Sequence, residues 1–247
     1  MHWSTAVKSN PDPYVLHLLA ALGIGFDCAS HGEISQVLDI GVDPSRIIFA
    51  NPCKPTSFVR SAAKAGVNMM TFDNGDELHK VARVHPGAKL ILRILTDDSK
   101  SLCRLGLKFG APLASVPGLL AKAKDLGLDV IGVSFHVGSG CFDANAFGDA
   151  VMRAKATFEM GKAAGYEFSL LDVGGGFEDD NFERMAGVLR GAIDLHFPSK
   201  AADGLRVIAE PGRFYVSRAF TLATNIIARR VPEGESIEGE IPSVMCE

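Results

Sequence analysis

The sequence predicts an α/β protein built on a closed (β/α)8 barrel, the TIM-barrel architecture. Short apolar runs alternate with amphipathic helical patterns along most of the 247 residues, which is typical of βα units in a parallel sheet. The runs are almost continuously apolar, as expected for strands whose outer faces are covered by helices. Eight such runs can be counted, and this number favours closure over the alternative, an open doubly wound sheet.

The predicted strands extend from residue 5 to residue 209. The first is among the shortest, with four residues, and helical patterns alternate with the later runs. In chain order the strands are Thr5–Lys8, Gly25–Cys28, Arg46–Ala50, Met69–Phe72, Lys89–Leu95, Asp129–Val137, Phe168–Val173 and Leu205–Ala209.

Helix signals stand between these runs. Pro11 and Pro13 open a helix, because proline suits the first turn. Its predicted apolar face comprises Val15, Leu18, Leu19 and Leu22. Ser30 and Glu33 have the spacing of a capping box and precede a second helix. A longer helix is predicted from the apolar positions Phe147, Val151, Ala154 and Phe158.

The composition argues against several classes of protein. A net charge of −4, with both signs interspersed, favours neither nucleic acid nor an anionic membrane as a partner. No run approaches the roughly 18 apolar residues of a transmembrane helix, and the first five residues lack signal-peptide features. The five cysteines form no CxxC pair, so reduced thiols and a cytoplasmic location are expected.

Polar residues lie at or after the ends of several predicted strands. In a closed barrel, catalytic side chains project from the C-terminal ends of the strands, so these residues are expected at one mouth. They comprise an amine, two carboxylates, two guanidinium groups, an imidazole and a glycine turn. In chain order they are Lys8, Asp27, Arg93, His136, Gly174-Gly175-Gly176, Glu210 and Arg213.

Each of these residues also has a purely structural interpretation. A lysine at a strand end is usually solvated, and a histidine there is more often a hydrogen-bonded core residue. The triple glycine matches neither a Walker A loop nor GxGxxG and can serve a tight turn alone. Glu210 and Arg213 can pair with each other. The convergence of all of them at one predicted mouth favours a functional site.

One cofactor, pyridoxal phosphate, would use all of these groups. It needs an amine for its Schiff base, a partner for its pyridine nitrogen and a phosphate site. Lys8 would supply the amine. Glu210 would keep the ring nitrogen protonated, because a nearby carboxylate favours the cationic form. His136 would stack on the ring, and no metal site is predicted.

The same interpretation assigns the remaining groups. Backbone N–H groups of residues 174–176, expected at a helix N-terminus, would bind the phosphate, and Arg213 would add positive charge. Asp27 and Arg93 would orient Lys8 and balance its charge.

At these residues the chain resembles the eukaryotic-type ornithine decarboxylases. These are fold-type III pyridoxal-phosphate enzymes with a barrel of the alanine-racemase-like type. The resemblance covers almost the whole chain. Its matching segments are AVKSN (6–10), FDCAS (26–30), NPCK (51–54), MMTFD (69–73), LR (92–93), DDSK (97–100), KFG (108–110), SFHVGSGC (134–141), DVGGGF (172–177) and EPGR (210–213).

The resemblance implies roles for individual residues. Lys8 would carry the Schiff base, Glu210 would meet the pyridine nitrogen and His136 would stack on the ring. The phosphate would be held by Ser139, Gly174, Gly175, Gly176, Gly212 and Arg213. The resemblance also implies L-ornithine as the substrate, a head-to-tail homodimer and an antizyme-like protein as a regulatory partner.

The chain departs from the family pattern at both ends. Family members begin well before the Schiff-base lysine and continue into a full β-domain, which carries a catalytic cysteine and completes the partner's site. Residues 1–214 are therefore expected to form a barrel with a shortened first strand, and 215–247 the start of a C-terminal β-domain that is not completed. Phe220–Val231 is the predicted first strand of that domain. Neither Cys141 nor Cys246 stands at the position of the family's catalytic cysteine.

Three functions are considered. The first is decarboxylation of L-ornithine to putrescine and CO2, for polyamine or alkaloid precursor synthesis, with lysine as an open alternative substrate. The second is a non-catalytic regulator resembling antizyme inhibitor, against which the retained Lys8, Asp27 and Glu210 argue. The third is a single-domain pyridoxal-phosphate carrier, which suits the length but not the decarboxylase-type motifs at 136–141 and 210–213.

Overall fold

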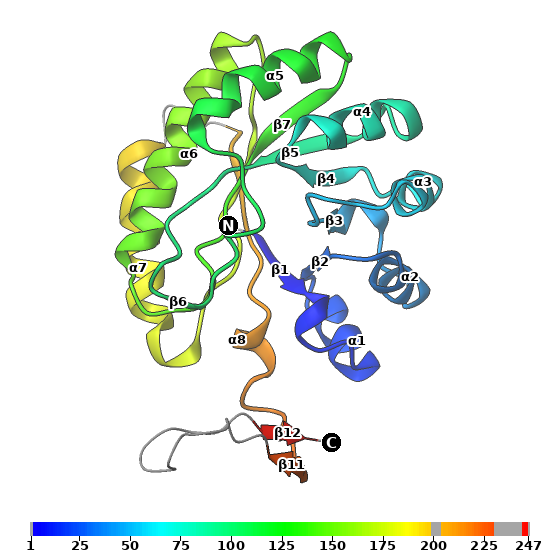
Figure 1. The fold of residues 1–247 in the computed structure, drawn as a ribbon, viewed down its shortest axis with the longest axis vertical. Coiled ribbons are helices and arrows are strands. Elements are labelled where there is room, and N and C mark those ends of the chain that lie inside the picture. The colour runs from blue at the N-terminus through cyan, green and yellow to red at the C-terminus, as the bar shows by residue number, and fades with distance from the viewer. Residues whose placement is uncertain (1, 199–203, 230–243, 247) are drawn as a thin grey trace. The chain divides into compact units, whose positions relative to one another are not determined.

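A computed structural model describes residues 2–198, 204–229 and 244–246 of the chain (Figure 1). Eight parallel strands close into a barrel in the order β1-β10-β9-β7-β5-β4-β3-β2. The predicted (β/α)8 barrel is therefore confirmed, and the open sheet is wrong. The barrel strands are β1 (His2–Ala6), β2 (Gly25–Cys28), β3 (Ile47–Phe49), β4 (Met69–Phe72), β5 (Lys89–Arg93), β7 (Asp129–Ser134), β9 (Leu170–Asp172) and β10 (Arg206–Ala209).

Helices follow the strands and lie outside them, as Figure 1 shows for α1 to α7. Their bounds are α1 (Pro13–Ala21), α2 (His31–Asp39), α3 (Thr56–Lys64), α4 (Gly75–Val84), α5 (Val116–Asp125), α6 (Asn145–Ala163), α7 (Phe182–His196) and α8 (Arg213–Val216). Within the described ranges, no helix has both the length and the apolar character needed to cross a membrane.

Several strands end earlier than predicted, and this moves two candidate residues into loops. β1 ends at Ala6, and Lys8 lies in the 3₁₀ segment Val7–Ser9 that follows. β7 ends at Ser134, so His136 stands two residues beyond it. Apolar character continues past both strand ends, because buried loop residues are as apolar as strand residues, and the pattern alone does not separate them.

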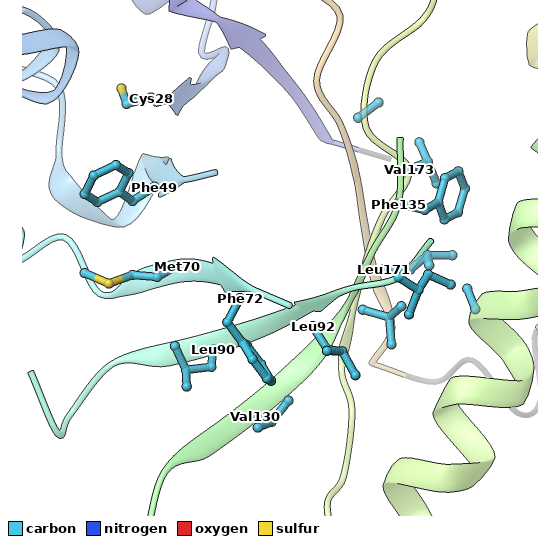
Figure 2. Packing of buried hydrophobic residues seen from close by; sticks show 14 of the residues in the cluster. Cys28, Phe49, Met70, Phe72, Leu90, Leu92, Val130, Phe135, Leu171 and Val173 are labelled. Atoms are coloured by element: carbon cyan, nitrogen blue, oxygen red, sulfur yellow. The ribbon is translucent and has the colours of Figure 1, made fainter. Parts of the chain in front are cut away.

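The core has two layers. The outer layer lies between the strands and the helices, and Figure 2 shows part of it, with Phe49, Phe72 and Leu92 among the residues pointing away from the barrel interior. The inner layer is small and fills the barrel itself, where Ile48, Ile91, Leu170 and Ile208 meet. Side chains alternate along a strand, so β3, β5, β9 and β10 each contribute to both layers.

The first two helices test the predicted faces and caps. In α1, Leu19 is buried, but Leu18 and Leu22 are 61% and 67% exposed, so the predicted face is partly wrong. Leucines occur on more than one side of this helix, and the side with Leu16 packs inward. The cap of α2 is confirmed, because the hydroxyl of Ser30 accepts the N–H of Glu33.

Two antiparallel pairs were not predicted. β6 (Ser101–Cys103) pairs with β8 (Ser139–Cys141) beside the loops that follow β5 and β7. β11 (Ile226–Arg229) pairs with β12 (Val244–Cys246). The predicted strand Phe220–Val231 thus forms only over residues 226–229, and its last two residues lie outside the described ones. The chain divides into the units Met1–Tyr215 and Val216–Glu247.

Candidate active site

Polar side chains line the barrel interior at the C-terminal ends of the strands. Arg93, Asp172 and Glu210 each stand two residues beyond a member of the apolar inner layer, so they face the same interior. Asp27 pairs in register with Ile48 and faces inward as well. The predicted mouth therefore exists, with its polar groups directly above the apolar layer.

Four buried oxygen atoms in this polar layer have no hydrogen-bond partner. They are Asp27 Oδ1, Ser134 Oγ, Asp172 Oδ2 and Glu210 Oε1. Ser134 belongs to the layer because it pairs in register with Arg93 on one side and Asp172 on the other. Buried polar atoms are nearly always paired, so this concentration indicates a site that receives a polar ligand.

Lys8 is oriented by Asp27. Its Nζ donates to Asp27 Oδ2 at 2.6 Å, and its side chain is 52% exposed whereas that of Asp27 is 2% exposed. Burial disfavours the ammonium, but the charge of Asp27 and that of Glu210 outweigh this effect and raise the pKa of Lys8. The amine is therefore charged, fixed by a buried carboxylate and open to the mouth.

Glu210 stands beside Asp172, a residue that the sequence analysis did not single out. Burial raises the pKa of Glu210 well above its ordinary value, and the negative charge of Asp172 adds to the rise. Burial also raises the pKa of Asp172, to about 7, although a hydrogen bond from the N–H of Gly174 opposes this. Asp172 opens the DVGGGF segment, and its place inside an apolar strand was the available signal.

His136 is a neutral ring next to the glycine turn. Its Nδ1 accepts the N–H of Gly138 at 2.9 Å, which assigns the proton to Nε2. Burial, with the positive charges of Arg93 and Lys8, lowers the pKa of His136 well below its ordinary value. A Cβ at Gly175 would lie 3.1 Å from His136 Nε2, so the glycine leaves room for the imidazole.

The glycine turn is tightly enclosed. Gly174 and Gly176 have φ values of +63° and +103°, and a Cβ at either would come within 2.6 Å of a backbone oxygen. Because the N–H of Gly174 donates to Asp172, the proposed phosphate donors narrow to Gly175 and Gly176. The expected helix N-terminus is wrong: α7 begins only at Phe182, after a 3₁₀ turn.

Arg213 pairs with a different carboxylate from the one considered in the sequence. Its Nη1 lies 3.3 Å from Glu178 Oε1, and its side chain is half exposed. Glu178 follows the glycine turn by two residues, so Arg213 is held on the same side of the mouth as that turn. A pair between Arg213 and Glu210 is not formed.

Gly212 and Ser139 border the mouth from two other segments. A Cβ at Gly212 would come within 2.8 Å of the side chain of Ser9, which places residues 210–213 against the turn that carries Lys8. Ser139 is the first residue of β8, where it pairs with Cys103 of β6.

The contact that holds Lys8 is made by Asp27, and no ion pair or hydrogen bond joins Arg93 to Lys8. The guanidinium of Arg93 lies over the ring of Phe109, 5.1 Å from the centroid. Glu210 is the strongest of the negative charges acting on it. Arg93 therefore counterbalances the carboxyl groups of the layer.

A buried ion-pair cluster outside the predicted set fixes the loops after β3 and β4. Lys54 Nζ lies 2.9 Å from Glu77 Oε1 and donates to the carbonyl oxygens of Asn51 and Thr71. Lys80 contacts the other oxygen of Glu77. Lys54 and Glu77 are 0% and 1% exposed. Nothing in the sequence pattern signals that this lysine is buried.

The residues at the mouth fit pyridoxal phosphate. Lys8 offers an oriented amine, and Glu210 offers a buried carboxyl oxygen without a partner. The neutral ring of His136 lies beside a turn whose two remaining N–H groups would suit a phosphate. Each of these groups is compatible with binding of the cofactor.

Comparisons with known proteins agree with this fit. Residues 3–217 match the family described as pyridoxal-dependent decarboxylase, pyridoxal binding domain. Ornithine decarboxylase of Neurospora crassa is 59% identical over 244 residues, which is 98% of this chain and 50% of that protein. Antizyme inhibitor 2 of Xenopus laevis is 55% identical over 233 residues, 92% of this chain and 51% of that protein.

Among solved structures, the arginine decarboxylase of Paramecium bursaria Chlorella virus has a TM-score of 0.87 at 40% identity, covering 95% of this chain and 64% of that one. The chain spans about half the length of the curated relatives it matches. The matches confirm the resemblance and its cofactor, pyridoxal phosphate, for the barrel. The chain belongs to the pyridoxal-dependent decarboxylase family, as a pyridoxal-binding barrel of the eukaryotic ornithine decarboxylase type.

Proposed function

We propose that this chain acts in the pyridoxal-phosphate-dependent decarboxylation of L-ornithine, which yields putrescine and CO2. The observation that carries the proposal is the ion pair of Lys8 with buried Asp27, at a mouth that also holds the unpaired carboxyl oxygen of Glu210. An amine for covalent attachment and a carboxyl group for the ring nitrogen are the two groups this cofactor requires of a decarboxylase.

When bound, the cofactor supplies a conjugated ring that accepts the electron pair left by the departing CO2. Lys8 attaches the cofactor, and Asp27 holds the amine in position. Glu210 would keep a proton at the ring nitrogen. His136 would stack against the ring as a neutral imidazole and so place no positive charge there.

A separate set of residues would bind the phosphate group of the cofactor. The N–H groups of Gly175 and Gly176 would donate to it, with Ser139 and Gly212 beside them and Arg213 supplying charge. Arg213 would exchange its contact with Glu178 for the phosphate, which its half-exposed side chain permits.

The choice of ornithine is part of the proposal. It is supported by the 59% identity to the Neurospora crassa ornithine decarboxylase, whereas the solved structure with a TM-score of 0.87 is an arginine decarboxylase. The proposal also includes a homodimer, a cytoplasmic location and an antizyme-like partner, because the chain resembles the ornithine decarboxylases. Polyamine and alkaloid precursor synthesis would both use the putrescine.

The test is release of CO2 from carboxyl-labelled L-ornithine by the 247-residue chain, with and without added pyridoxal phosphate. Cofactor-dependent release that is abolished by Lys8→Ala is the expected result. Labelled L-lysine and L-arginine, assayed in parallel, decide the substrate. A folded chain that binds the cofactor through Lys8 and releases no CO2 would contradict the proposed activity of this chain.

A second candidate is a non-catalytic regulator, favoured by the 55% identity to Antizyme inhibitor 2 of Xenopus laevis. The two candidates differ in cofactor binding at Lys8. Borohydride reduction after incubation with pyridoxal phosphate should leave a stable label on Lys8 if the decarboxylase proposal is correct, and no label if the chain is a regulator without cofactor chemistry.

A further inference from the structure

Asp172 and Glu210 form a closed arrangement through the glycine turn. Gly174 donates its N–H to Asp172 Oδ1 at 2.9 Å and accepts the N–H of Glu210 on its carbonyl oxygen at 2.7 Å. The two residues are 1% and 8% exposed, and each has one carboxyl oxygen without a hydrogen-bond partner. The backbone of Gly174 thus contacts both residues and holds them side by side in the buried layer.

A hydrogen bond between two carboxyl groups requires a proton. Neither Asp172 Oδ2 nor Glu210 Oε1 has a hydrogen-bond donor among the described residues. Two ionised carboxylates in contact away from water would repel each other, whereas one shared proton turns the repulsion into a charge-assisted hydrogen bond. We propose that Asp172 is a positioning residue for Glu210, and that the two carboxyl groups share one proton until the cofactor binds.

The charges around Asp172 and Glu210 are balanced when this pair carries one proton. Asp27 projects from β2, and the cations Lys8 and Arg93 stand after β1 and at the end of β5. His136 adds no charge, because its pKa is lowered well below the ordinary value. With one shared proton, the layer contains two positive and two negative charges. With none it would carry a net negative charge, and with two a net positive one.

The raised pKa values point the same way. Burial, opposed by the Gly174 N–H, raises the pKa of Asp172 to about 7, and burial together with Asp172 and Asp27 raises the pKa of Glu210 well above its ordinary value. Both shifts favour a proton on the pair near neutral pH. This pair titrates as a unit, so the proton belongs to both groups.

The shared proton matters for cofactor binding, and this step rests on the proposed function. A protonated ring nitrogen would donate to Glu210 and replace the shared proton as its hydrogen-bond partner. The pair then gives up its proton, to the ring if the nitrogen arrives unprotonated and otherwise to water. Asp172 would thus determine the protonation state of Glu210, the residue that accepts the hydrogen bond of the ring nitrogen.

The first test uses the cofactor-free chain and infrared spectroscopy. We expect a protonated-carboxyl band at pH 7 that shifts in D2O and disappears as the pH rises. Asp172→Asn and Glu210→Gln should each remove it. In Asp172→Asn the amide oxygen can still accept from Gly174, and the charge balance leaves Glu210 ionised. Asp98→Asn, at a buried carboxylate outside the layer, should retain the band.

The second test counts protons. Calorimetric titration of pyridoxal phosphate in two buffers of different ionisation enthalpy gives the number of protons released per site. The wild-type chain should release about one proton more than Asp172→Asn, because only the wild type starts with the shared proton. Attachment at Lys8 contributes equally to both chains and cancels in the comparison.

The outcomes separate this inference from the proposed function. A wild-type spectrum without a protonated carboxyl at pH 7, or equal proton release from the two chains, would overturn it even if the cofactor binds and CO2 is formed. A chain that shows the band but binds no cofactor would leave the shared proton in place and remove the decarboxylase proposal instead.

Discussion

Gly212 lies directly against Ser9: a Cβ at Gly212 would come within 2.8 Å of the Ser9 Cβ and 3.1 Å of that of Ala6. Ser9 is itself fixed, because its hydroxyl donates to the carbonyl oxygen of Ala6 at 2.7 Å. The close approach joins the segment after β10 to the turn after β1. These two segments carry Glu210 and Lys8, so the contact fixes where the carboxyl group stands relative to the amine.

Gly212→Ala is therefore expected to disturb the site. The added methyl group must displace Ser9 or the Glu210 segment, at a cost of about 1–3 kcal/mol in the free energy of unfolding. Affinity for pyridoxal phosphate should fall as well, because Glu210 moves relative to Lys8. Denaturant unfolding and a cofactor titration measure the two effects.

Gly191→Ala is the matched control for this substitution. Gly191 lies inside α7, where a Cβ would meet nothing within 4 Å. The variant should be more stable by roughly 0.5–1 kcal/mol, since alanine favours a helix interior over glycine. Equal behaviour of the two variants would show that the contact between Gly212 and Ser9 has no importance.

The buried pair of Lys54 and Glu77 predicts a large stability effect. Lys54→Met leaves Lys80 as the cation that contacts Glu77 and removes the donor to the carbonyl oxygens of Asn51 and Thr71. Breaking one side of a buried pair costs about 3–5 kcal/mol, and the remaining contact with Lys80 places this case near the lower value. Urea unfolding measures the loss.

The exposed pair of Lys89 and Asp129 is the control for burial. Its side chains are 52% and 50% exposed. Lys89→Met should therefore cost less than about 1 kcal/mol, because water screens an exposed pair. A loss at Lys89 as large as that at Lys54 would refute the role assigned to burial.

The sequence was sufficient for the barrel and for the identity of its polar mouth. Strand ends in a parallel barrel meet at one edge, so Lys8, Asp27 and Glu210 could be placed together without coordinates. The residues that neighbour these three in the fold could not be placed from the sequence. Asp172 lies beside the Glu210 segment because β9 and β10 are in a particular register, and a pattern of apolar residues does not contain that register.

Other differences have local physical causes. Arg213 pairs with Glu178 because the chain turns after β10, which separates it from Glu210. The face of α1 was partly wrong because Leu16, Leu18, Leu19 and Leu22 fit more than one helical stripe. The β6–β8 pair was missed because its strands are three residues long, too short for periodicity to indicate them.

The neutral state of His136 predicts a dependence of stability on pH. Its pKa is lowered by burial in the folded chain, whereas in the unfolded chain the imidazole titrates near 6.5. The unfolded state therefore binds more protons below about pH 6.5, and stability falls as the pH falls through that value. The contribution of this one group approaches about 1.4 kcal/mol per pH unit.

His136→Gln tests this by difference. The carboxyl pair of Asp172 and Glu210 has the opposite effect on acidification, because its pKa values are raised in the folded state. That effect is present in both chains. The variant should therefore lose less stability than the wild type between pH 6.5 and 5. Parallel curves for the two chains would mean that the pKa of His136 is the same in the folded and the unfolded chain.

The contact between Lys8 and Asp27 can be separated from the chemistry by a double-mutant cycle. Lys8→Ala leaves a carboxylate that is 2% exposed without its cation, and such a loss costs about 1–3 kcal/mol, towards the lower value here because Lys8 is half exposed. Adding Asp27→Asn removes the buried charge, so the double variant should be more stable than Lys8→Ala alone.

The pH at which this cycle is measured follows from the sign of the shift. The pKa of Lys8 is raised in the fold, so the pair stabilises fully below the unfolded value of about 10.4 and loses this contribution as the pH rises through the folded pKa. Measurements at pH 7 therefore include the whole interaction. If Lys8→Ala and Asp27→Asn were additive at pH 7, the contact would contribute nothing to the fold. Asp27 would then matter only for the placement of the amine, and the stability of the mouth would depend on the remaining charges.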